Sequence, residues 1–206
     1  NYIYVGILLT MIGILGLQGD YAAHGKMLDA IDTPNRVVKK PEQLTEIDGL
    51  IFPGGESTTL IKLMDAWGWW QPLKDFANTK PVFGTCAGMI LVAKKVSSPP
   101  QQSLNLIDID VERNGYGRQV DSFEGNGSLR ADGQARNMPM IFIRAPRITR
   151  MGHGVEILAE CRGDVVMARQ GHVVVASFHP ELSDDLSVHR HFAKTVDQRA
   201  SQRMID

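Results

Sequence analysis

The sequence predicts an α/β fold of three layers, in which a mostly parallel central sheet is flanked by helices. Two observations carry this prediction. In the first half of the chain, short apolar runs alternate with segments of helical spacing, and this alternation is typical of βαβ units and a parallel sheet. After the proline-rich stretch at residues 97–103, nearly every segment has the composition of a β-strand, until a closing helix is expected at residues 187–202.

The expected elements follow one another in a simple order. In the first half we expect strands at residues 12–18, 35–40, 46–55 and 80–86, and helices at residues 20–31, 57–78 and 87–96. The long second helix contains Gly68 and Pro72, so we expect it to be broken near these residues. Further strands are expected within residues 105–114, 119–128, 138–148, 155–161 and 164–181.

Composition limits the classes of protein to which the chain can belong. Its 206 residues suffice for one sizeable core, and 43% hydrophobic with 22% charged residues is ordinary for a globular domain. The net charge of −1 creates no field that favours nucleic acid or an anionic membrane, so we expect neither as a partner. Cys86 and Cys161 cannot form a disulfide framework, which fits a cytoplasmic protein and leaves each cysteine either catalytic or simply buried.

The N-terminal segment needs its own interpretation. No charged residue occurs from Tyr2 to Gln18, but this stretch is short for a membrane helix and lacks the basic start of a signal peptide. We interpret residues 1–10 as an N-terminal extension, native or not. We expect a single domain over residues 11–206, which begins with a buried strand after Met11.

Cys86 lies in the most informative motif of the chain. Gly84-Thr-Cys-Ala-Gly88 stands between an apolar strand and an apolar helix, which is the arrangement of a nucleophile elbow. The tight turn would crowd larger side chains, so glycines suit positions 84 and 88. The helix N-terminus would favour the thiolate of Cys86, and the N–H of Ala87 would point to a developing oxyanion. The alternative is a small cysteine packed between sheet and helix.

A thiolate nucleophile needs a base, and His179 is the best candidate among the histidines. It follows an apolar strand and precedes Pro180, which disfavours helix for the residue before it. In an extended segment His179 and Glu181 project to the same side, so the carboxylate can hold the tautomer of the imidazole. The alternative is a loop histidine beside an exposed acid.

The other histidines receive plainer interpretations. We expect surface or capping positions for His24, His153 and His172. His189 and His191 are two residues apart in the closing helix and therefore face different directions, which argues against a metal pair.

A glycine-rich turn from Phe52 to Thr58 joins the third expected strand to a helix, with Ser57 or Thr58 as the expected N-cap. Gly54 and Gly55 let backbone N–H groups approach a ligand closely, which suits an oxyanion hole or amide binding. The turn is not a phosphate-binding P-loop, because no Lys-Ser/Thr pair follows at the required spacing. The alternative is an ordinary strand-to-helix turn.

These motifs, in this order, resemble those of class I, triad-type glutamine amidotransferases. Longer strings are similar to the glutaminase subunits of pyridoxal 5′-phosphate synthases: GILGLQGD, FPGGESTTLIKLM, PVFGTCAGMILVAK, VERNGYGRQVDSFEG, FIRAP and ASFHPELSDDLSVHRHF. The resemblance covers residues 11 to about 196. It implies the flavodoxin-like, three-layer fold of these proteins.

The resemblance also implies an activity and a partner. Such subunits hydrolyse L-glutamine to L-glutamate and ammonia through a cysteine thioester, without a metal or another cofactor. The ammonia passes to a separate (β/α)8-barrel subunit, which makes pyridoxal 5′-phosphate from ribose 5-phosphate and glyceraldehyde 3-phosphate. We therefore expect a large hetero-oligomer with this synthase subunit.

Residue roles carry over by motif. Cys86 matches the nucleophile, His179 the base and Glu181 the acid that orients it. The implied substrate-binding residues are Gly54, Gly55, Glu56, Arg113, Ile143 and Arg144. Gly55 and Ala87 are the implied oxyanion donors, with Gln18 as a further candidate. The charges of Glu56, Arg113 and Arg144 suit the α-ammonium and α-carboxylate of glutamine.

Two departures and two alternatives stay open. Arg147 stands where these subunits have an aromatic residue, and the extension at residues 1–10 is unusual; both concern the pocket rim or the partner-facing surface. The first alternative is a class I glutaminase of another pathway, such as imidazole glycerol phosphate synthesis, or a cysteine peptidase of similar fold. The second is a non-catalytic regulatory subunit that keeps the fold.

Overall fold

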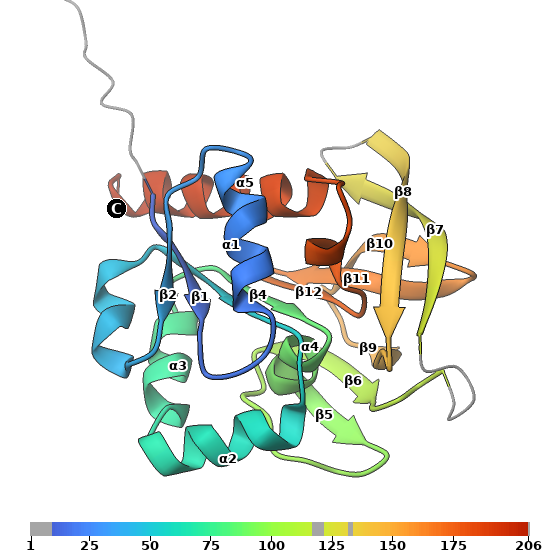
Figure 1. The fold of residues 1–206 in the computed structure, drawn as a ribbon, viewed down its shortest axis with the longest axis horizontal. Coiled ribbons are helices and arrows are strands. Elements are labelled where there is room, and N and C mark those ends of the chain that lie inside the picture. Colours follow the sequence, from blue (N-terminus) through green and yellow to red (C-terminus); the bar gives the residue numbers. More distant parts are fainter. Residues whose placement is uncertain (1–9, 117–121, 132–133, 206) are drawn as a thin grey trace, which may run out of the picture.

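The computed structural model describes residues 10–116, 122–131 and 134–205 (Figure 1). Most of the expected N-terminal extension therefore lies outside the described residues. Thr10 is described, and its buried hydroxyl donates a hydrogen bond to Asp197 in the closing helix. The expected division into an extension and a single domain over residues 11–206 stays a prediction.

Helices and strands alternate through the first half of the chain, and strands fill most of the second half. The helices are α1 (Tyr21–Asp29), α2 (Ser57–Trp67), α3 (Trp70–Ala77), α4 (Ala87–Val92) and α5 (Ser187–Arg203), with 3-10 helices η1 (Pro41–Glu46) and η2 (Pro180–Leu182). The strands are β1 (Ile12–Leu15), β2 (Asn35–Val38), β3 (Gly49–Phe52), β4 (Val82–Thr85), β5 (Ala93–Ser97), β6 (Ile107–Glu112), β7 (Ser122–Ala131), β8 (Gln134–Ile143), β9 (Arg147–Met151), β10 (Glu156–Cys161), β11 (Asp164–Gln170) and β12 (Val173–Ala176).

The main sheet has two halves. Among the described residues it has nine strands in the order β2-β1-β3-β4-β12-β11-β10-β7-β8, and β5, β6 and β9 form a smaller sheet. The strands from β2 to β12 are all parallel, whereas those from β12 to β8 pair in antiparallel fashion. Figure 1 shows this antiparallel extension at the end of the molecule away from β2. The predicted α/β class is confirmed, and the predicted strand-rich second half forms the extension and the smaller sheet.

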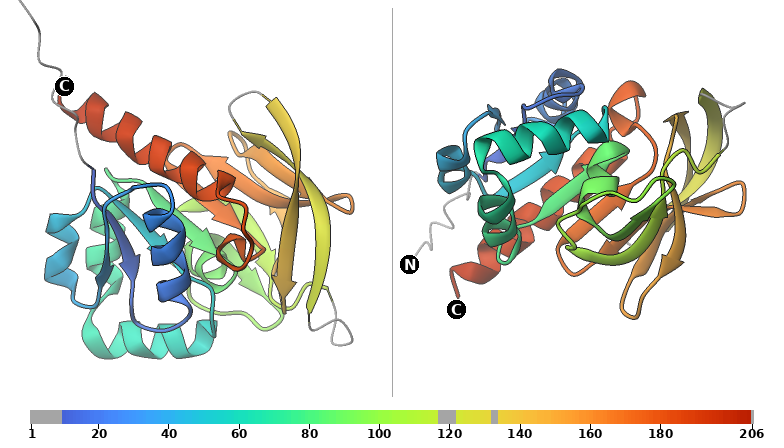
Figure 2. Two further views of the ribbon diagram at one scale, coloured as in Figure 1. Left: turned by 45° about the horizontal axis from the view of Figure 1, so that its top comes forward. Right: turned by 90° about the horizontal axis from the view of Figure 1, so that it is seen from below.

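Helices cover both faces of the parallel half, because each buried strand sends alternate side chains to opposite faces. In β3, Leu50 and Phe52 pack with the apolar residues of α2, α3 and α4, whereas Ile51 packs with those of α1 and α5. The two further views place α5 in front of the sheet from one side and α2, α3 and α4 in front from the other (Figure 2). The three predicted layers are therefore present.

Two expected helix boundaries have different outcomes, one set by local geometry and one by strand pairing. The break between α2 and α3 falls at Gly68, whose left-handed φ of 68° closes α2, while Pro72 lies in the first turn of α3, where its missing N–H costs little. The helix expected to reach Val96 ends instead at Val92. From Ala93 onward the chain is extended and pairs with β6, which buries Val96 in the core.

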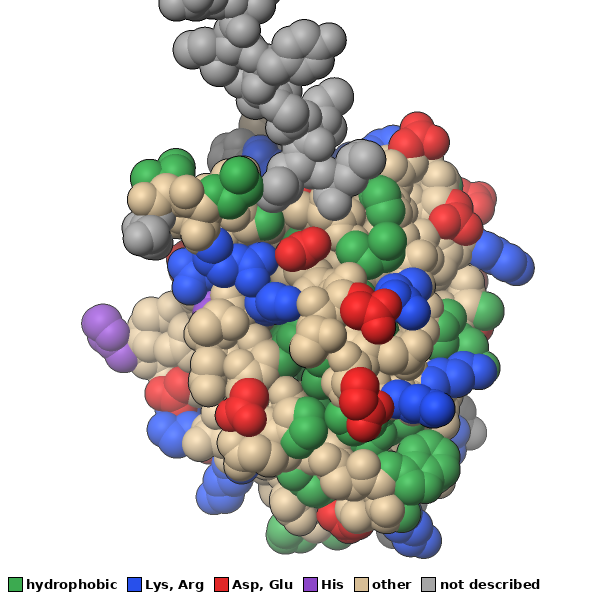
Figure 3. Space-filling view, turned by 90° about the vertical axis from the view of Figure 1, so that its left-hand side faces the viewer, with side chains coloured by type: hydrophobic (Ala, Val, Ile, Leu, Met, Phe, Trp, Pro, Cys, Tyr) green, Lys and Arg blue, Asp and Glu red, His purple; other side chains and the backbone are tan. Residues whose placement is uncertain are grey.

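The described surface is mixed in charge, and within the described residues no helix combines the length and apolarity required to cross a bilayer. On the face at the β2 edge of the sheet, acidic and basic side chains lie next to one another over much of the area (Figure 3). This distribution agrees with the net charge of −1.

Candidate active site

The candidate site forms where three adjacent parallel strands end. β4 lies between β3 and β12, with Gly84 opposite Phe52 and Thr85 opposite Ala176. The loops after these strands carry the Pro-Gly-Gly turn, Cys86 and His179. Parallel strands present their carboxyl ends at one edge of the sheet, so motifs from distant parts of the sequence converge there.

Cys86 occupies a strained turn between β4 and α4. Its backbone has φ 47° and ψ −105°, which non-glycine residues rarely adopt. A Cβ at position 88 would lie 2.1 Å from the Phe52 carbonyl oxygen, and one at position 84 would lie 2.6 Å from the Gly88 backbone. Only glycine fits at both positions, so the predicted nucleophile elbow is present in the structure.

His179 and Glu181 form a hydrogen-bonded pair beside the elbow. Nδ1 of His179 lies 2.7 Å from Oε1 of Glu181, and both side chains are nearly buried. Burial alone would lower the pKa of His179, but hydrogen bonds with Cys86 and Glu181 raise it to about 10. A protonated imidazole therefore sits between the sulfur and the carboxylate at neutral pH. This is the arrangement that a thiolate nucleophile requires.

A pocket of about 200 Å³ opens above Cys86. Seven of the predicted site residues line it: Gly55, Glu56, Cys86, Arg113, Ile143, Arg144 and His179. Ser57, Ile90 and Asn114 also line it and were not predicted. Ser57 and Asn114 lie in the quoted motif strings directly after Glu56 and Arg113, but their residue types alone did not point to a role, and Ile90 is an ordinary apolar residue of the expected helix.

The rim of the pocket carries opposite charges. Arg113 lies 3.9 Å from Glu56, and its guanidinium also approaches the Thr58 hydroxyl at 3.5 Å. The N-cap of α2 is Glu56, not Ser57 or Thr58 as expected, because its carboxylate accepts from the N–H groups of Thr58 and Thr59. Hydrogen bonds from these two threonines lower the pKa of Glu56 to about 2. The rim thus offers one fixed anion and one cation to a zwitterionic ligand.

The glycine pair packs directly against the reacting groups. A Cβ at Gly54 would lie 2.5 Å from Cε1 of His179, and one at Gly55 would lie 2.4 Å from Oε1 of Gln18. The same Gln18 oxygen accepts a hydrogen bond of 2.9 Å from the Glu56 N–H. Gln18 therefore packs against the glycine turn and hydrogen-bonds to it, but it does not line the pocket. Its role in an oxyanion hole stays a prediction.

The opposite wall comes from the end of β8. Ile143 is partly exposed, and its carbonyl oxygen lies 3.8 Å from Sγ of Cys86. Arg144 and Asn114 both have a left-handed φ, at 42° and 52°. Two strained residues that face one pocket are consistent with a functional site. Ala87 begins α4 as predicted, buried directly behind the cysteine.

Comparison with known proteins agrees with this geometry. A family model described as the SNO glutamine amidotransferase family matches residues 14–198. The chain belongs to the SNO glutamine amidotransferase family. Pyridoxal 5′-phosphate synthase subunit PdxT of Niallia circulans is 49% identical over 186 residues, covering 90% of this chain and 97% of the relative. The PdxT subunit of Thermosipho africanus is also 49% identical, over 90% of this chain and 98% of its own.

Solved structures support the same fold. One described as a glutamine amidotransferase is 40% identical, with a TM-score of 0.83 over 90% of this chain and 98% of its own. Another, described as a putative GMP synthase protein from Thermoplasma acidophilum, has a TM-score of 0.70 at 14% identity, over 96% of this chain and 97% of its own. The second likeness concerns the fold alone.

One prediction for the histidines of this amidotransferase is wrong. His24 was expected at the surface or as a cap, yet it is completely buried, with Nε2 3.4 Å from Oε2 of Glu181. A lone histidine in an amphipathic helix gives no sign of which buried group it will meet. His153 is exposed as expected, while the partly buried His172 contacts the Ala77 carbonyl oxygen at 2.7 Å.

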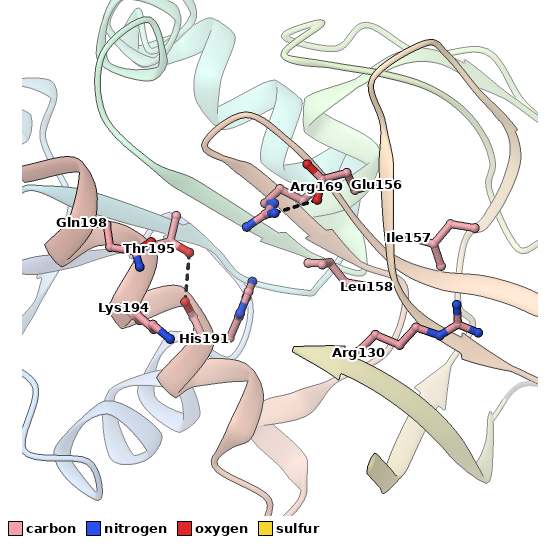
Figure 4. Close-up of a pocket in the computed structure, with 9 residues that line it drawn as sticks. All are labelled: Arg130, Glu156, Ile157, Leu158, Arg169, His191, Lys194, Thr195 and Gln198. Atoms are coloured by element: carbon pink, nitrogen blue, oxygen red, sulfur yellow. Dashed lines mark hydrogen bonds and ion pairs between the residues drawn. The ribbon is translucent and has the colours of Figure 1, made fainter. Parts of the chain in front are cut away.

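The two histidines of α5 face different directions, as predicted. His189 lies 2.9 Å from His24, whereas His191 lines a separate cavity of about 360 Å³ between α5 and the antiparallel extension (Figure 4). The arginines of that cavity, Arg130 and Arg169, form ion pairs with glutamates. None of the predicted site residues lines this cavity.

Arg147, the departure noted in the sequence, lies outside the pocket of this family member. Its guanidinium pairs with Asp164 of β11 at 2.8 Å, and it does not line the pocket above Cys86. The aromatic-to-arginine difference is thus accommodated by a surface ion pair.

Proposed function

We infer that this member of the SNO glutamine amidotransferase family is the glutaminase subunit of a pyridoxal 5′-phosphate synthase. It hydrolyses L-glutamine to L-glutamate and ammonia, and the ammonia is used by the (β/α)8-barrel synthase subunit in vitamin B6 biosynthesis. The observation that carries this inference is the Cys86–His179–Glu181 alignment at the base of a charged pocket. Two free cysteines agree with the cytoplasmic location that we propose.

In the first half-reaction we propose that the Cys86 thiolate attacks the side-chain amide carbon of glutamine. A C–S bond forms and the amide oxygen takes up the negative charge, which we propose the N–H groups of Gly55 and Ala87 stabilise. Protonated His179 donates its proton to the amide nitrogen. The C–N bond then breaks, and ammonia leaves behind a glutamyl thioester.

In the second half-reaction His179 is neutral and acts as a base. It takes a proton from water, and the resulting hydroxide attacks the thioester carbon. The C–S bond breaks, which releases glutamate and restores the thiolate beside a protonated imidazole. Glu181 keeps the ring in one orientation through both steps and stabilises its charged form.

The remaining roles concern substrate binding. We propose that Arg113 and Arg144 bind the α-carboxylate of glutamine and that Glu56 attracts its α-ammonium group. Gly54 lets the glycine turn pack closely against His179 and Cys86, where a Cβ would clash, and Ile143 closes the opposite wall. A pocket of about 200 Å³ is small, which suits a single amino acid.

The test separates glutamine hydrolysis from synthase chemistry. The chain is combined with the barrel subunit, and pyridoxal 5′-phosphate formation is followed with either glutamine or ammonium chloride as the nitrogen source. We expect Cys86→Ala to abolish synthesis from glutamine and to leave synthesis from ammonium chloride at the wild-type rate. Glutamine-dependent synthesis by the Cys86→Ala complex would contradict the proposed function.

A further inference from the structure

A row of buried polar side chains lies behind the proposed triad. Thr85 ends β4, His24 lies in α1 and His189 lies in α5, and none of the three has any exposed surface. Three elements of the fold therefore place polar groups in the core behind Glu181. Buried polar groups are costly unless they are hydrogen-bonded, so this row calls for a specific explanation.

The distances define one connected chain of contacts. Nε2 of His189 lies 2.9 Å from Nδ1 of His24. Nε2 of His24 lies 3.2 Å from Oγ1 of Thr85 and 3.4 Å from Oε2 of Glu181. Oε1 of Glu181 then meets Nδ1 of His179 at 2.7 Å. The two oxygens of Glu181 therefore face two different histidines.

The pattern of partners selects one tautomer for each inner histidine. If Nε2 of both rings carries the proton, His189 donates to His24, and His24 donates toward Glu181 and Thr85. With the opposite tautomers, the Nδ1–H of His189 would be a buried donor without a partner among the described residues. In addition, the lone pair of His24 Nε2 would face the carboxylate. Both features are unfavourable in a buried site, so the first arrangement is preferred.

We propose that His24 is a positioning residue that donates from Nε2 to Glu181 and, held in turn by His189, fixes the carboxylate that orients His179. This role rests on the proposed glutaminase function. It extends the Cys86–His179–Glu181 row by two histidines, which link the site to α1 and α5. His24 itself lies behind Glu181 and does not line the substrate pocket.

The electrostatic setting agrees with neutral inner histidines. The charged or titratable groups that act on His24 are Glu181, His179, His189 and Asp20 at the start of its own helix. Burial outweighs the two carboxylates and lowers the pKa of His24, and burial together with His24 lowers the pKa of His189 to about 3. A neutral ring still has one N–H to donate, so it can satisfy Glu181 without adding a second buried charge.

The two oxygens of Glu181 differ: Oε1 is hydrogen-bonded to His179, whereas the buried Oε2 lacks a hydrogen bond among the described residues. Burial would raise its pKa, yet its interactions with His24 and His179 bring the pKa below the ordinary value. Nε2 of His24 lies 3.4 Å from Oε2, and a hydrogen bond donated there would keep the carboxylate from rotating away from His179. The rate of both half-reactions depends on that orientation.

Two amide substitutions at position 24 test the proposal. The amide nitrogen of glutamine comes close to the position of histidine Nε2, whereas that of asparagine comes close to Nδ1. In the complex with the synthase subunit, we expect His24→Asn to lower kcat roughly 10–100-fold, by analogy with the loss of groups that hydrogen-bond and orient metal ligands. We expect His24→Gln to keep kcat near the wild-type value, with KM for glutamine unchanged in both.

The control is His172→Asn, since His172 is partly buried and contacts the Ala77 backbone carbonyl but does not line the pocket. It should leave kcat and KM unchanged. A purely space-filling role for His24 predicts that the Asn and Gln variants lose activity in parallel with their melting temperatures, and that outcome would overturn the proposal. Equal, wild-type kcat in both variants would overturn it as well.

A second measurement does not depend on activity. Nitrogen-15 histidine spectra of the wild-type chain report the tautomer of each ring directly. We expect the Nε2–H form for both His24 and His189 at neutral pH. An Nδ1–H form of His24 would overturn its proposed positioning role, even if the chain proves to be a glutaminase. If the tautomers are as expected but the complex makes no pyridoxal 5′-phosphate from glutamine, the proposed function is contradicted instead.

Discussion

At the scale of the residue, His179 shows how neighbours decide the chemistry of a side chain. An isolated buried imidazole would lose its proton, because desolvation penalises the charged ring. Here hydrogen bonds with Cys86 and Glu181 reverse that tendency and raise the pKa of His179 to about 10. The proton needed by the leaving ammonia is therefore already in place when glutamine binds.

The charge state of His179 can be measured by histidine NMR titration. In the wild-type protein we expect the ring to stay protonated through pH 8 and to titrate near pH 10. Its proton stabilises the folded state fully below pH 6.5, the ordinary value, and that contribution is lost as pH rises through about 10. In Cys86→Ala one of the two hydrogen bonds that raise the pKa is gone, so the midpoint should fall. An identical midpoint in both proteins would show that Cys86 does not interact with the ring.

At the scale of the element, α2 is tied to the pocket through its cap. The carboxylate of Glu56 accepts from two backbone N–H groups and two threonine hydroxyls at the first turn. The same carboxylate lines the pocket, so one residue both starts the helix and shapes the site. Glu56 is thus expected to matter for stability as well as for substrate binding.

The cap makes a pH-dependent contribution to stability. We expect Glu56→Ala to lower the free energy of unfolding by about 1 kcal/mol at pH 7, as for other lost N-caps, and Glu56→Gln to cost less because one acceptor oxygen remains. Because the folded-state pKa is depressed to about 2, the contribution is present above pH 4.5 and is lost as pH falls toward 2. Urea unfolding at pH 7 and at pH 3.5 measures it. If the difference in the free energy of unfolding between wild type and Glu56→Ala does not shrink at pH 3.5, the role of Glu56 as a charged N-cap is contradicted.

Sequence reasoning predicts elements well where a strong local signal exists. The elbow at Cys86, the strand before His179 and the break at Gly68 each have a local steric cause, and all three are present in the structure. The helix that ends at Val92 was predicted too long, because its end is set by pairing of β5 with β6 rather than by local propensity. The burial of His24 against Glu181 could not be foreseen, since it depends on how α1 packs over the sheet.

At the scale of the whole molecule, the parallel half of the sheet assembles the site and the antiparallel half completes it. β4 brings Cys86 from the first half of the chain, and β12 returns from the extension to lie beside it with His179. β8 of the extension ends at Ile143, and this residue and the following Arg144 form the opposite wall. The fold therefore explains why a nucleophile and its base, far apart in sequence, meet at one strand edge.

The second cysteine provides a matched control for the central claim. Cys161 lies in β10, where burial raises the pKa of its thiol, and it is not part of the pocket. An inert, buried thiol of this kind can be replaced without removing a reacting group. Comparing the two cysteines therefore separates the loss of a nucleophile from the general effect of a cysteine-to-alanine change.

The most direct test is the rate of glutamate release from glutamine by the complex with wild-type, Cys86→Ala or Cys161→Ala chains. We expect Cys86→Ala to fall by more than about 10³-fold, because no other group can form the thioester, while Cys161→Ala stays near the wild-type rate. Thermal unfolding of each variant confirms that the fold is kept. Substantial glutamate release by a folded Cys86→Ala chain would contradict the account.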